Sequence, residues 1–424
     1  MSETEVSEEG TGSSENADGD AGPTDPGDRI VSLDVLRGFA LLGILVINIW
    51  LFALPTVGTL NPTLYGDMSG INYAAWFVSH VFFEQKFVTL FTFLFGAGMV
   101  LFMETKERKG QPARRLHFRR TFWLLVIGLG HAYLLWYGDI LVAYALCGFL
   151  LVFVRRWRPR RLLVLGLFMF ALPATLYLLG GVGYTVADAE TQSEIEDTVL
   201  EGFGAEAVEA EKAVFQGDWL GQVEFRAPIV LSLQTFGFAV ESFWLFGGLM
   251  VIGMSLYKQG VLSNERSTRF YRRLFVGGAV PGLALILTGV WYRHAVDWDT
   301  VQVLLLARQF NHWGSLLLGL AYVAGIMLVC RYAAGRVTDT LSAVGRTAFS
   351  NYLLQTVIAT SIFYGHGLGL FGTLERAELL VVVVLIWAVQ VPLSVFWLDR
   401  FRFGPVEWLW RTLTYGERQP MRKE

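Results

Sequence analysis

The stretch that decides the fold is residues 119–153, RRTFWLLVIGLGHAYLLWYGDILVAYALCGFLLVF. It contains two apolar runs of about 15 to 17 residues, joined at residues 136–139, and each run is near the lower length limit for a helix that crosses a bilayer. Arginines flank both runs, as is common where helices leave the membrane. The stretch therefore predicts a helical hairpin that crosses the membrane and returns.

Two ionisable residues lie inside this hairpin: His131 in the first run and Asp139 at the turn. A charged side chain at the bilayer centre costs roughly 2.5 to 3.5 kcal/mol, so we expect a neutral His131 that faces protein or a water-filled cavity. His131 lies twelve residues after Arg119, about 18 Å along a helix and past the middle of a ~30 Å core. We expect a catalytic His131 with Asp139 to orient it; the open alternative is that both only hydrogen-bond within the bundle.

The rest of the chain has the same apolar character. Of its 424 residues, 54% are hydrophobic and 17% are charged, and the hydrophobic residues occur in long blocks. This predicts an all-α fold, a polytopic membrane bundle of about ten transmembrane helices. Outside the hairpin, spans are predicted at residues 33–54, 87–103, 162–184, 229–256, 274–292, 313–330, 349–364 and 379–398. Residues 71–83 are aromatic and amphipathic, which predicts a helix in the membrane interface.

The distribution of lysine and arginine predicts the orientation. If ten spans alternate, 28 basic residues fall in one set of connecting segments and five in the other. The connectors 106–120 and 155–161 hold seven and five of them, whereas residues 185–228 hold eleven carboxylates and two basic residues. By the positive-inside rule, both termini are cytoplasmic, residues 185–228 form an extracytoplasmic acidic loop, and the protein is a multi-pass protein of the cell membrane.

Three segments follow from the composition. Residues 1–28 carry nine acidic side chains and no basic one, which predicts a disordered acidic tail that is retained, because it lacks the pattern of a signal peptide. Residues 29–417 form one transmembrane helical domain, and residues 418–424 form a C-terminal tail. Cys147 and Cys330 lie in apolar runs, which predicts two buried thiols, and the sequence shows no metal-ligand spacing. The charge pattern gives no indication of nucleic-acid binding.

Further polar residues lie at the ends of the early spans or inside later ones. Asp34 and Arg37 are three residues apart on one helical face, where they can pair. Lys86 lies at the mouth of the second span, as a functional cation or only a snorkelling side chain. Glu241 lies inside a span and must be protonated, paired or hydrated. His294 and His312 are expected at the surface or interface.

Six blocks carry a resemblance to a known family. They are RIVSLDVLRGFALLGILVIN (29–48), EQKFVTLFTFLFGAG (84–98), GLGHAYLLWYGDILVAYALCG (128–148), GRTAFSNYLLQTVI (345–358), IFYGHGLGLFG (362–372) and FRFGPVEWLWRTLTYG (401–416). Together they resemble the YeiB-like family of prokaryotic multi-spanning membrane proteins, whose C-terminal half is a domain of unknown function. The resemblance covers nearly all of the chain after Asp28.

That family is grouped with transmembrane acyltransferases such as heparan-alpha-glucosaminide N-acetyltransferase, whose first helix opens with a similar motif. Here the motif is Leu33-Asp34-Val35-Leu36-Arg37-Gly38. The resemblance implies transfer of an acyl group from a cytoplasmic acyl-CoA to a sugar or other hydroxyl or amine acceptor at the outer face. The segment after the first span departs from the acetyltransferase. Both His80 and His131 are therefore candidates for the residue that corresponds to its catalytic histidine.

For acyl transfer, we expect His131 and Asp139 to be catalytic. Residues expected to bind the substrate or the acyl-CoA donor are Asp34, Arg37, Lys86, Arg115, Arg119 and Arg120. All of them except Lys86 are expected at the cytoplasmic mouth. The alternative function is a small-molecule transporter with a proton-coupled polar path through His131, Asp139, Glu241 and Lys86; a third is a non-catalytic membrane scaffold. Expected partners are membrane lipid, the acyl donor and the acceptor, with a homodimer as a further possibility.

Overall fold

The computed structural model describes residues 30–201 and 204–423, so the predicted acidic tail at residues 1–28 lies outside the described residues. All named elements of this part of the chain are helices, which confirms the all-α fold. Their bounds are α1 Val31–Ala53, α2 Thr56–Leu60, α3 Gly70–Phe82, α4 Lys86–Arg108, α5 Ala113–Gly130, α6 Leu141–Leu151, α7 Pro159–Val186, α8 Ala189–Leu200, α9 Ala205–Gln216, α10 Trp219–Ser232, α11 Phe243–Lys258, α12 Thr268–Ala295, α13 Thr300–Gln302, α14 Arg308–Tyr332, α15 Arg336–Arg346, α16 Ala348–Phe363, α17 Arg376–Arg400 and α18 Pro405–Tyr415.

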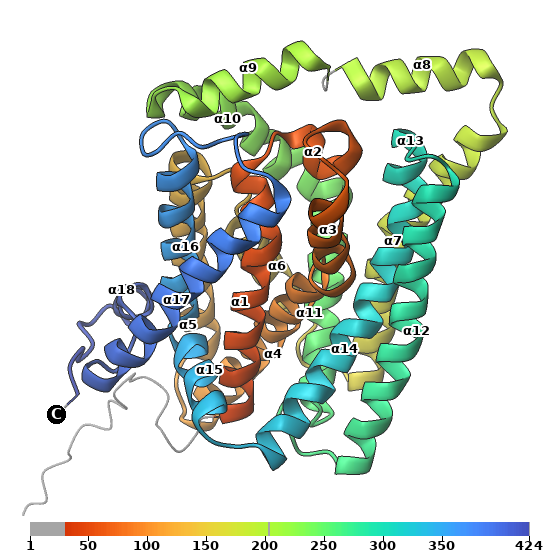
Figure 1. The fold of residues 1–424 in the computed structure, drawn as a ribbon. Helices are drawn as coiled ribbons and strands as arrows, with labels where there is room; N and C mark the ends of the chain where they lie inside the picture. The colour runs from red at the N-terminus through yellow and green to blue at the C-terminus, as the bar shows by residue number, and fades with distance from the viewer. Residues whose placement is uncertain (1–29, 202–203, 424) are drawn as a thin grey trace, which may run out of the picture.

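Seven helical segments of the described chain are long and apolar enough to cross a membrane. They are α1, α3 with α4, α7, α10 with α11, α12, α13 with α14, and α17. The other three of the ten predicted spans correspond to the shorter helices α5, α6 and α16, which pack among the long ones (Figure 1). π-helical turns extend three segments: His131–Leu135 after α5, Leu233–Ser242 between α10 and α11, and Val303–Ala307 before α14.

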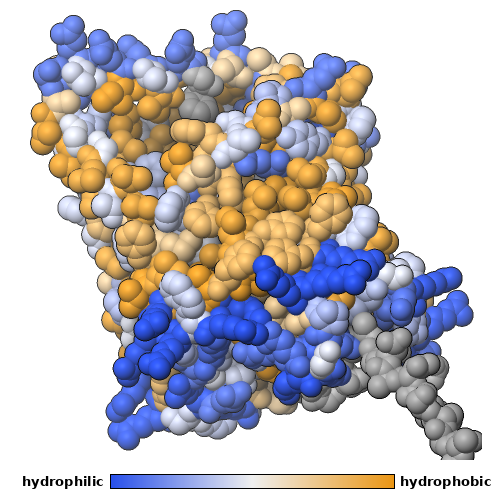
Figure 2. Space-filling model, turned by 180° about the vertical axis from the view of Figure 1, so that it is seen from behind, coloured by the Kyte–Doolittle hydropathy of each residue, from blue (hydrophilic) through white to orange (hydrophobic). Residues whose placement is uncertain are grey.

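Helix α1 lies in the centre of the bundle, and its apolar side chains pack against neighbouring helices on all sides. In its most apolar window 67% of residues are buried, against 28% in α12 and in α17, whose outer faces carry exposed valine, leucine and tryptophan side chains. On the face that Figure 2 shows, hydrophobic side chains form a broad zone across the middle of the molecule, and hydrophilic ones gather at both ends. This distribution is typical of a membrane protein whose middle zone contacts lipid.

Two glycines let α1 approach α15 closely. A Cβ on Gly38 would overlap the carbonyl oxygen of Leu341, and a Cβ on Gly345 would overlap the carbonyl oxygen of Asp34. Small residues at such a contact let two backbones pack against each other, as they do between membrane helices. Helix α15, which was not predicted, therefore fixes the start of α1.

The two ends of the bundle differ in charge. Helices α8 and α9, from the acidic segment, lie across one end, while α18 and the C-terminus lie near the other, where α1 begins (Figure 1). This arrangement agrees with the predicted alternation of the connecting segments.

Two segments differ from the sequence-based expectations. Helix α3 was expected in the membrane interface, but it stands along the bundle against α17 and forms one discontinuous span with α4 (Figure 1). The helix breaks at Gln85, whose φ is 64°. Residues 418–423 were expected as a tail, but the Arg402 N–H bonds to the Met421 carbonyl at 2.9 Å and the Trp408 indole bonds to the Gln419 carbonyl at 2.7 Å.

Candidate active site

The hairpin brings its histidine and its carboxylate into contact. Helix α5 ends at Gly130, and the π-helical turn His131–Leu135 leads to an extended Trp136, which turns the chain back toward α6. His131 Nδ1 lies 2.7 Å from Asp139 Oδ1, and both side chains are 1% exposed. Asp139 Oδ2 accepts the Val142 N–H at 2.8 Å, so this carboxylate also satisfies a backbone donor in the first turn of α6.

A third residue completes a polar chain. Thr356 on α16 lies with its hydroxyl oxygen 2.9 Å from His131 Nε2. Carboxylate, imidazole and hydroxyl are thus linked in order, and all three side chains are buried. Because Nδ1–H donates to the carboxylate, Nε2 is the nitrogen that accepts a proton. The arrangement has the components of an acid–base relay.

The backbone around His131 is fixed by residues of helix α10. Arg226 on α10 is fully buried, and its guanidinium donates to the carbonyls of Tyr133, Leu134 and Leu135 at 3.0, 2.7 and 2.9 Å. The Trp219 indole donates to the Leu134 carbonyl at 2.9 Å. These donors satisfy carbonyls that the end of the helix leaves without partners, so helix α10 holds the π-helical turn in place.

Aromatic rings surround the histidine. Trp136 stacks on Phe52 of α1 with 4.0 Å between ring centroids, and the Tyr352 ring lies 5.1 Å from the imidazole. The Trp136 ring lies 6.2 Å from His131, and its Nε1 is buried without a hydrogen-bond partner among the described residues. The relay is therefore enclosed in an apolar environment that contains one unused N–H donor.

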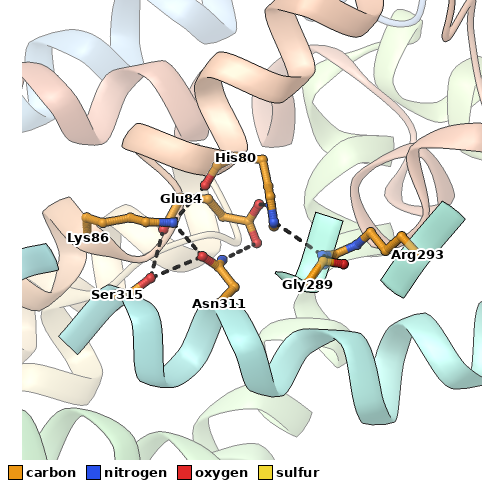
Figure 3. A network of polar contacts seen from close by, with 7 residues as sticks. All are labelled: His80, Glu84, Lys86, Gly289, Arg293, Asn311 and Ser315. Atoms are coloured by element: carbon orange, nitrogen blue, oxygen red, sulfur yellow. Dashed lines mark hydrogen bonds and ion pairs between the residues drawn. The ribbon is translucent and has the colours of Figure 1, made fainter. Parts of the chain in front are cut away.

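A second buried polar network lies at the break between α3 and α4 (Figure 3). His80 Nδ1 contacts Glu84 Oε2 at 2.5 Å, and Arg293 of α12 lies 3.2 Å from His80 Nε2. The Lys86 ammonium donates to the His80 carbonyl at 2.7 Å and to the Asn311 side chain on α14. Lys86 is thus neither a snorkelling cation nor a neighbour of His131; it satisfies the carbonyl end of α3.

The network in Figure 3 joins the break between α3 and α4 to helices α12 and α14. Asn311 also donates to Glu84 Oε1 at 3.2 Å, and the Ser315 hydroxyl donates to the Glu84 carbonyl at 3.3 Å. The side chains of Lys86, Asn311 and Ser315 are buried. Two cations, one carboxylate and one imidazole within a membrane bundle are costly without polar partners. Here His80 contacts Glu84 and Arg293, while a carbonyl and an amide hold Lys86.

The basic end of the bundle holds the remaining predicted residues. Asp34 and Arg37 form an ion pair at 2.8 Å, as their spacing predicted. The Arg120 guanidinium stacks 4.2 Å from the Trp410 ring of α18 and lies close enough to Arg37 to interact electrostatically. Arg119 lies beside Gly416.

Arg115 is placed differently from its neighbours. It is exposed and lines a shallow depression at the same end, together with Arg114 and Phe118. Arg37, Arg119 and Arg120 are thus brought together by α1, α5 and α18, while Arg115 faces outward on the adjoining surface.

The other polar residues singled out have local partners. Glu241 is paired with Arg308 at 2.6 Å and accepts the Tyr177 hydroxyl at 2.7 Å, which explains how a carboxylate is tolerated there. His312 stacks on Phe170 at 3.9 Å and is buried, whereas the exposed His294 bonds to the Tyr73 hydroxyl. Neither Glu241 nor these histidines contacts His131.

Comparison with known proteins identifies relatives along almost the whole chain. The uncharacterized protein YxaH of Bacillus subtilis (strain 168) is 33% identical over 413 residues, which cover 95% of this chain and 98% of the relative. The uncharacterized protein YeiB of Escherichia coli (strain K12) is 33% identical over 396 residues, which cover 91% and 96%. The chain belongs to the YeiB-like family.

Two further comparisons extend this result. A 39.9 kDa protein from the amylase 3' region of Bacillus acidopullulyticus is 27% identical over 93% of this YeiB-like chain and 96% of its own length. Residues 256–417 match a family described as a protein of unknown function (DUF418), which covers α12 through α18. No solved structure matches the chain.

Thr356 and Arg226 are the site residues that the sequence of this YeiB-like protein did not indicate. Thr356 lies in a span predicted from its apolar residues, and Arg226 lies in the acidic segment as one of two cations. One signal was present: Asn351, Gln355 and Thr360 share the span of Thr356 at helical spacing. Such polar residues mark an inward helix face. Arg226 had no comparable signal, because its partners are backbone atoms about 90 residues away.

Proposed function

We propose that this protein transfers an acyl group from a cytoplasmic acyl-CoA to a hydroxyl or amine acceptor at the opposite face of the cell membrane. The observation that carries the proposal is the contact between His131 and Asp139 inside the bundle. A neutral imidazole held by a carboxylate can take up the proton that an acceptor hydroxyl or amine loses during the transfer. An enclosed site strengthens such interactions.

The charge at the two ends supports the direction of transfer. Arg37, Arg119 and Arg120 gather at the end where α18 packs, and guanidinium groups bind the phosphates of a donor such as CoA. His131 follows Arg120 by eleven residues, about 16 Å along a helix. By the positive-inside rule the basic end faces the cytoplasm, so the acceptor arrives from the end covered by α8 and α9.

The site is closed in this structure, since His131 and Asp139 are both buried. Transfer therefore requires a second conformation in which the surrounding helices separate and admit the thioester. The protein would then exclude water from the reactive acyl group whenever the helices close, which prevents hydrolysis.

The break between α3 and α4 favours a second candidate function, a transporter. Discontinuous membrane helices with buried polar residues form the substrate and ion sites of many transporters. His80, Glu84, Lys86 and Arg293 occupy such a break. In this case the polar path lies at His80 and does not include His131.

The test is turnover of acyl-CoA by purified protein in proteoliposomes, measured as free CoA thiol across a panel of donors and acceptors. We expect His131→Ala to abolish turnover and to retain acyl-CoA binding, while His294→Ala, at the surface, behaves as the wild type. Equal turnover by the wild type and His131→Ala contradicts the assignment. The transporter is supported instead if neither the wild type nor a variant turns over acyl-CoA, and if the wild type moves a small molecule across the proteoliposome membrane while His80→Ala does not.

A further inference from the structure

Thr356 differs from four threonines that lie in the middle of other helices. Thr92, Thr175, Thr235 and Thr288 donate to the carbonyl four residues earlier at 2.7 to 2.9 Å. This local bond is the usual partner of a helical threonine. For Thr356 the corresponding distance, to the Tyr352 carbonyl, is 3.4 Å, whereas His131 Nε2 is 2.9 Å away. The hydroxyl is thus engaged by the imidazole more closely than by its own helix.

The carboxylate of Asp139, the imidazole of His131 and the hydroxyl of Thr356 lie in the order that activates a hydroxyl as a nucleophile. Asp139 accepts the Nδ1–H of His131, so Nε2 carries a lone pair directed at a hydroxyl that it can deprotonate. These three groups come from the π-helical turn, the turn before α6, and α16, so only the folded bundle brings them together.

We propose that Thr356 is the nucleophile that carries the acyl group as a threonyl ester between donor and acceptor; this inference rests on the proposed acyl transfer. Thr356 Oγ1 attacks the thioester carbonyl carbon while its proton passes to His131 Nε2. The C–S bond then breaks, and the CoA thiolate takes that proton. In the second half, the acceptor hydroxyl or amine loses its proton to His131 and attacks the ester carbon. The bond to Thr356 Oγ1 breaks, and the proton returns to the threonine oxygen.

We assign stabilisation of the oxyanion in both steps to the Trp136 N–H. Its Nε1–H is buried and has no hydrogen-bond partner in the described part of the chain, although its ring lies beside His131. A buried polar group without a partner is uncommon in native structures. Preorganised N–H donors in an apolar site are a usual means of stabilising a tetrahedral oxyanion.

A covalent carrier also fits the position of Thr356. It is the ninth residue of the sixteen in α16, so it lies roughly 12 Å from the start of the helix and roughly 10 Å from its end. At such a depth the donor and the acceptor need not be bound at the same time. The donor acylates Thr356 from the basic end and leaves before the acceptor enters from the other.

The first experiment is independent of acyl-CoA. Purified full-length protein is treated with a fluorophosphonate probe, which phosphonylates activated hydroxyls, and the modified residue is located by peptide mass spectrometry. We expect an adduct on Thr356 that His131→Ala and Thr356→Val abolish and that Thr360→Val, a matched change one turn away, retains. Absence of an adduct on Thr356 overturns the proposal.

The second experiment separates this inference from the proposed function. Turnover of acyl-CoA should fall by about a thousandfold or more in Thr356→Val and stay within about tenfold of wild type in Thr356→Ser, which restores a hydroxyl. Wild type incubated with acyl-CoA alone should carry the acyl group on Thr356. Full turnover by Thr356→Val overturns the ester while the proposed function stands. Probe labelling of Thr356 without turnover by any protein supports the activated hydroxyl and contradicts acyl-CoA as its substrate.

Discussion

At the scale of the residue, the site depends on buried hydrogen bonds whose loss leaves other groups unsatisfied. Arg226 illustrates this, because one guanidinium satisfies three carbonyls of the π-helical turn. Hydrogen bonds to charged groups contribute about 1.5 to 3 kcal/mol each, and a buried acceptor without a donor costs a further penalty. The position of His131 is therefore sensitive to a residue that does not touch it.

We expect Arg226→Met to destabilise the protein by at least about 3 kcal/mol and to lower acyl-CoA turnover more than it lowers donor binding. Thermal unfolding in detergent and the kcat and KM of the donor measure the two effects. Arg269→Met, at an exposed arginine of α12, is the control and should change neither. Unchanged unfolding in Arg226→Met would show that the turn does not depend on this side chain.

The sequence indicated part of this site for a physical reason. His131 and Asp139 were recognised because polar residues stand out in an apolar hairpin, and their contact is local along the chain. Thr356 and Arg226 were missed because a threonine is common in apolar helices and an arginine is common in loops. Their roles arise only from contacts between distant segments, which no spacing in the sequence records.

At the scale of the element, the sequence predicted long helices better than short ones. The apolar blocks of α7, α12 and α17 are unmistakable, because these helices face lipid along much of their length. Helices α15 and α18 are eleven residues each and amphipathic, so hydropathy alone did not reveal them. The break between α3 and α4 was misread because its polar residues were taken to mark the end of a span.

The contact between α1 and α15 yields a prediction about packing. Gly345→Ala places a methyl group against the Asp34 carbonyl of α1, where backbone cannot yield as a side chain would. We expect a loss of about 1 to 3 kcal/mol, visible as a lower melting temperature. Gly98→Ala, on α4, meets no atom within 4 Å and serves as the matched control. Equal melting temperatures for the two variants would contradict the close contact.

The docking of α18 should depend on pH through Glu407. Its carboxyl group accepts the Phe349 N–H at 2.7 Å and the Ser350 N–H at 3.2 Å, at the start of α16. Burial raises the pKa of Glu407 above its ordinary value. A raised folded-state pKa means a stabilising contribution that is present below the unfolded pKa of about 4.3 and is lost as the pH rises through the folded pKa.

We therefore expect the melting temperature of the wild type to fall, relative to that of Glu407→Gln, as the pH is raised from about 4. Glutamine keeps an acceptor for the backbone but does not ionise. Glu417→Gln, at an exposed position beyond α18, is the control. A difference between wild type and Glu407→Gln that is constant with pH would show that the carboxyl group does not titrate in this range.

At the scale of the whole molecule, the arrangement of charge makes a prediction about orientation. The acidic helices α8 and α9 lie at the end opposite to the basic connectors (Figure 1), and by the positive-inside rule we expect the acidic end to face outward and the basic end to face the cytoplasm. In intact cells, Ser193→Cys in α8 should react with a membrane-impermeant maleimide. Arg160→Cys, at the start of α7, should react only after permeabilisation.

The native cysteines provide the background for that measurement. Cys147 is buried and Cys330 is half-buried, so a chain with both replaced by alanine should show no labelling of its own. Labelling of Ser193→Cys only from the cytoplasmic side would reverse the orientation and remove the cationic end from the reach of acyl-CoA.

The hydrogen bonds from Arg226 to the hairpin have a consequence for biosynthesis. When residues 119–153 leave the ribosome, the residue that satisfies their three carbonyls lies about 90 positions further along the chain, and Thr356 lies 225 positions beyond His131. Because translation adds about 5 to 20 residues per second, Thr356 is synthesised roughly 10 to 45 s after His131. During translation the nascent hairpin therefore lacks contacts that hold it in the folded protein. If the ribosome stalls before α16 is made, His131 lies in the membrane without the Thr356 hydroxyl that bonds to its Nε2.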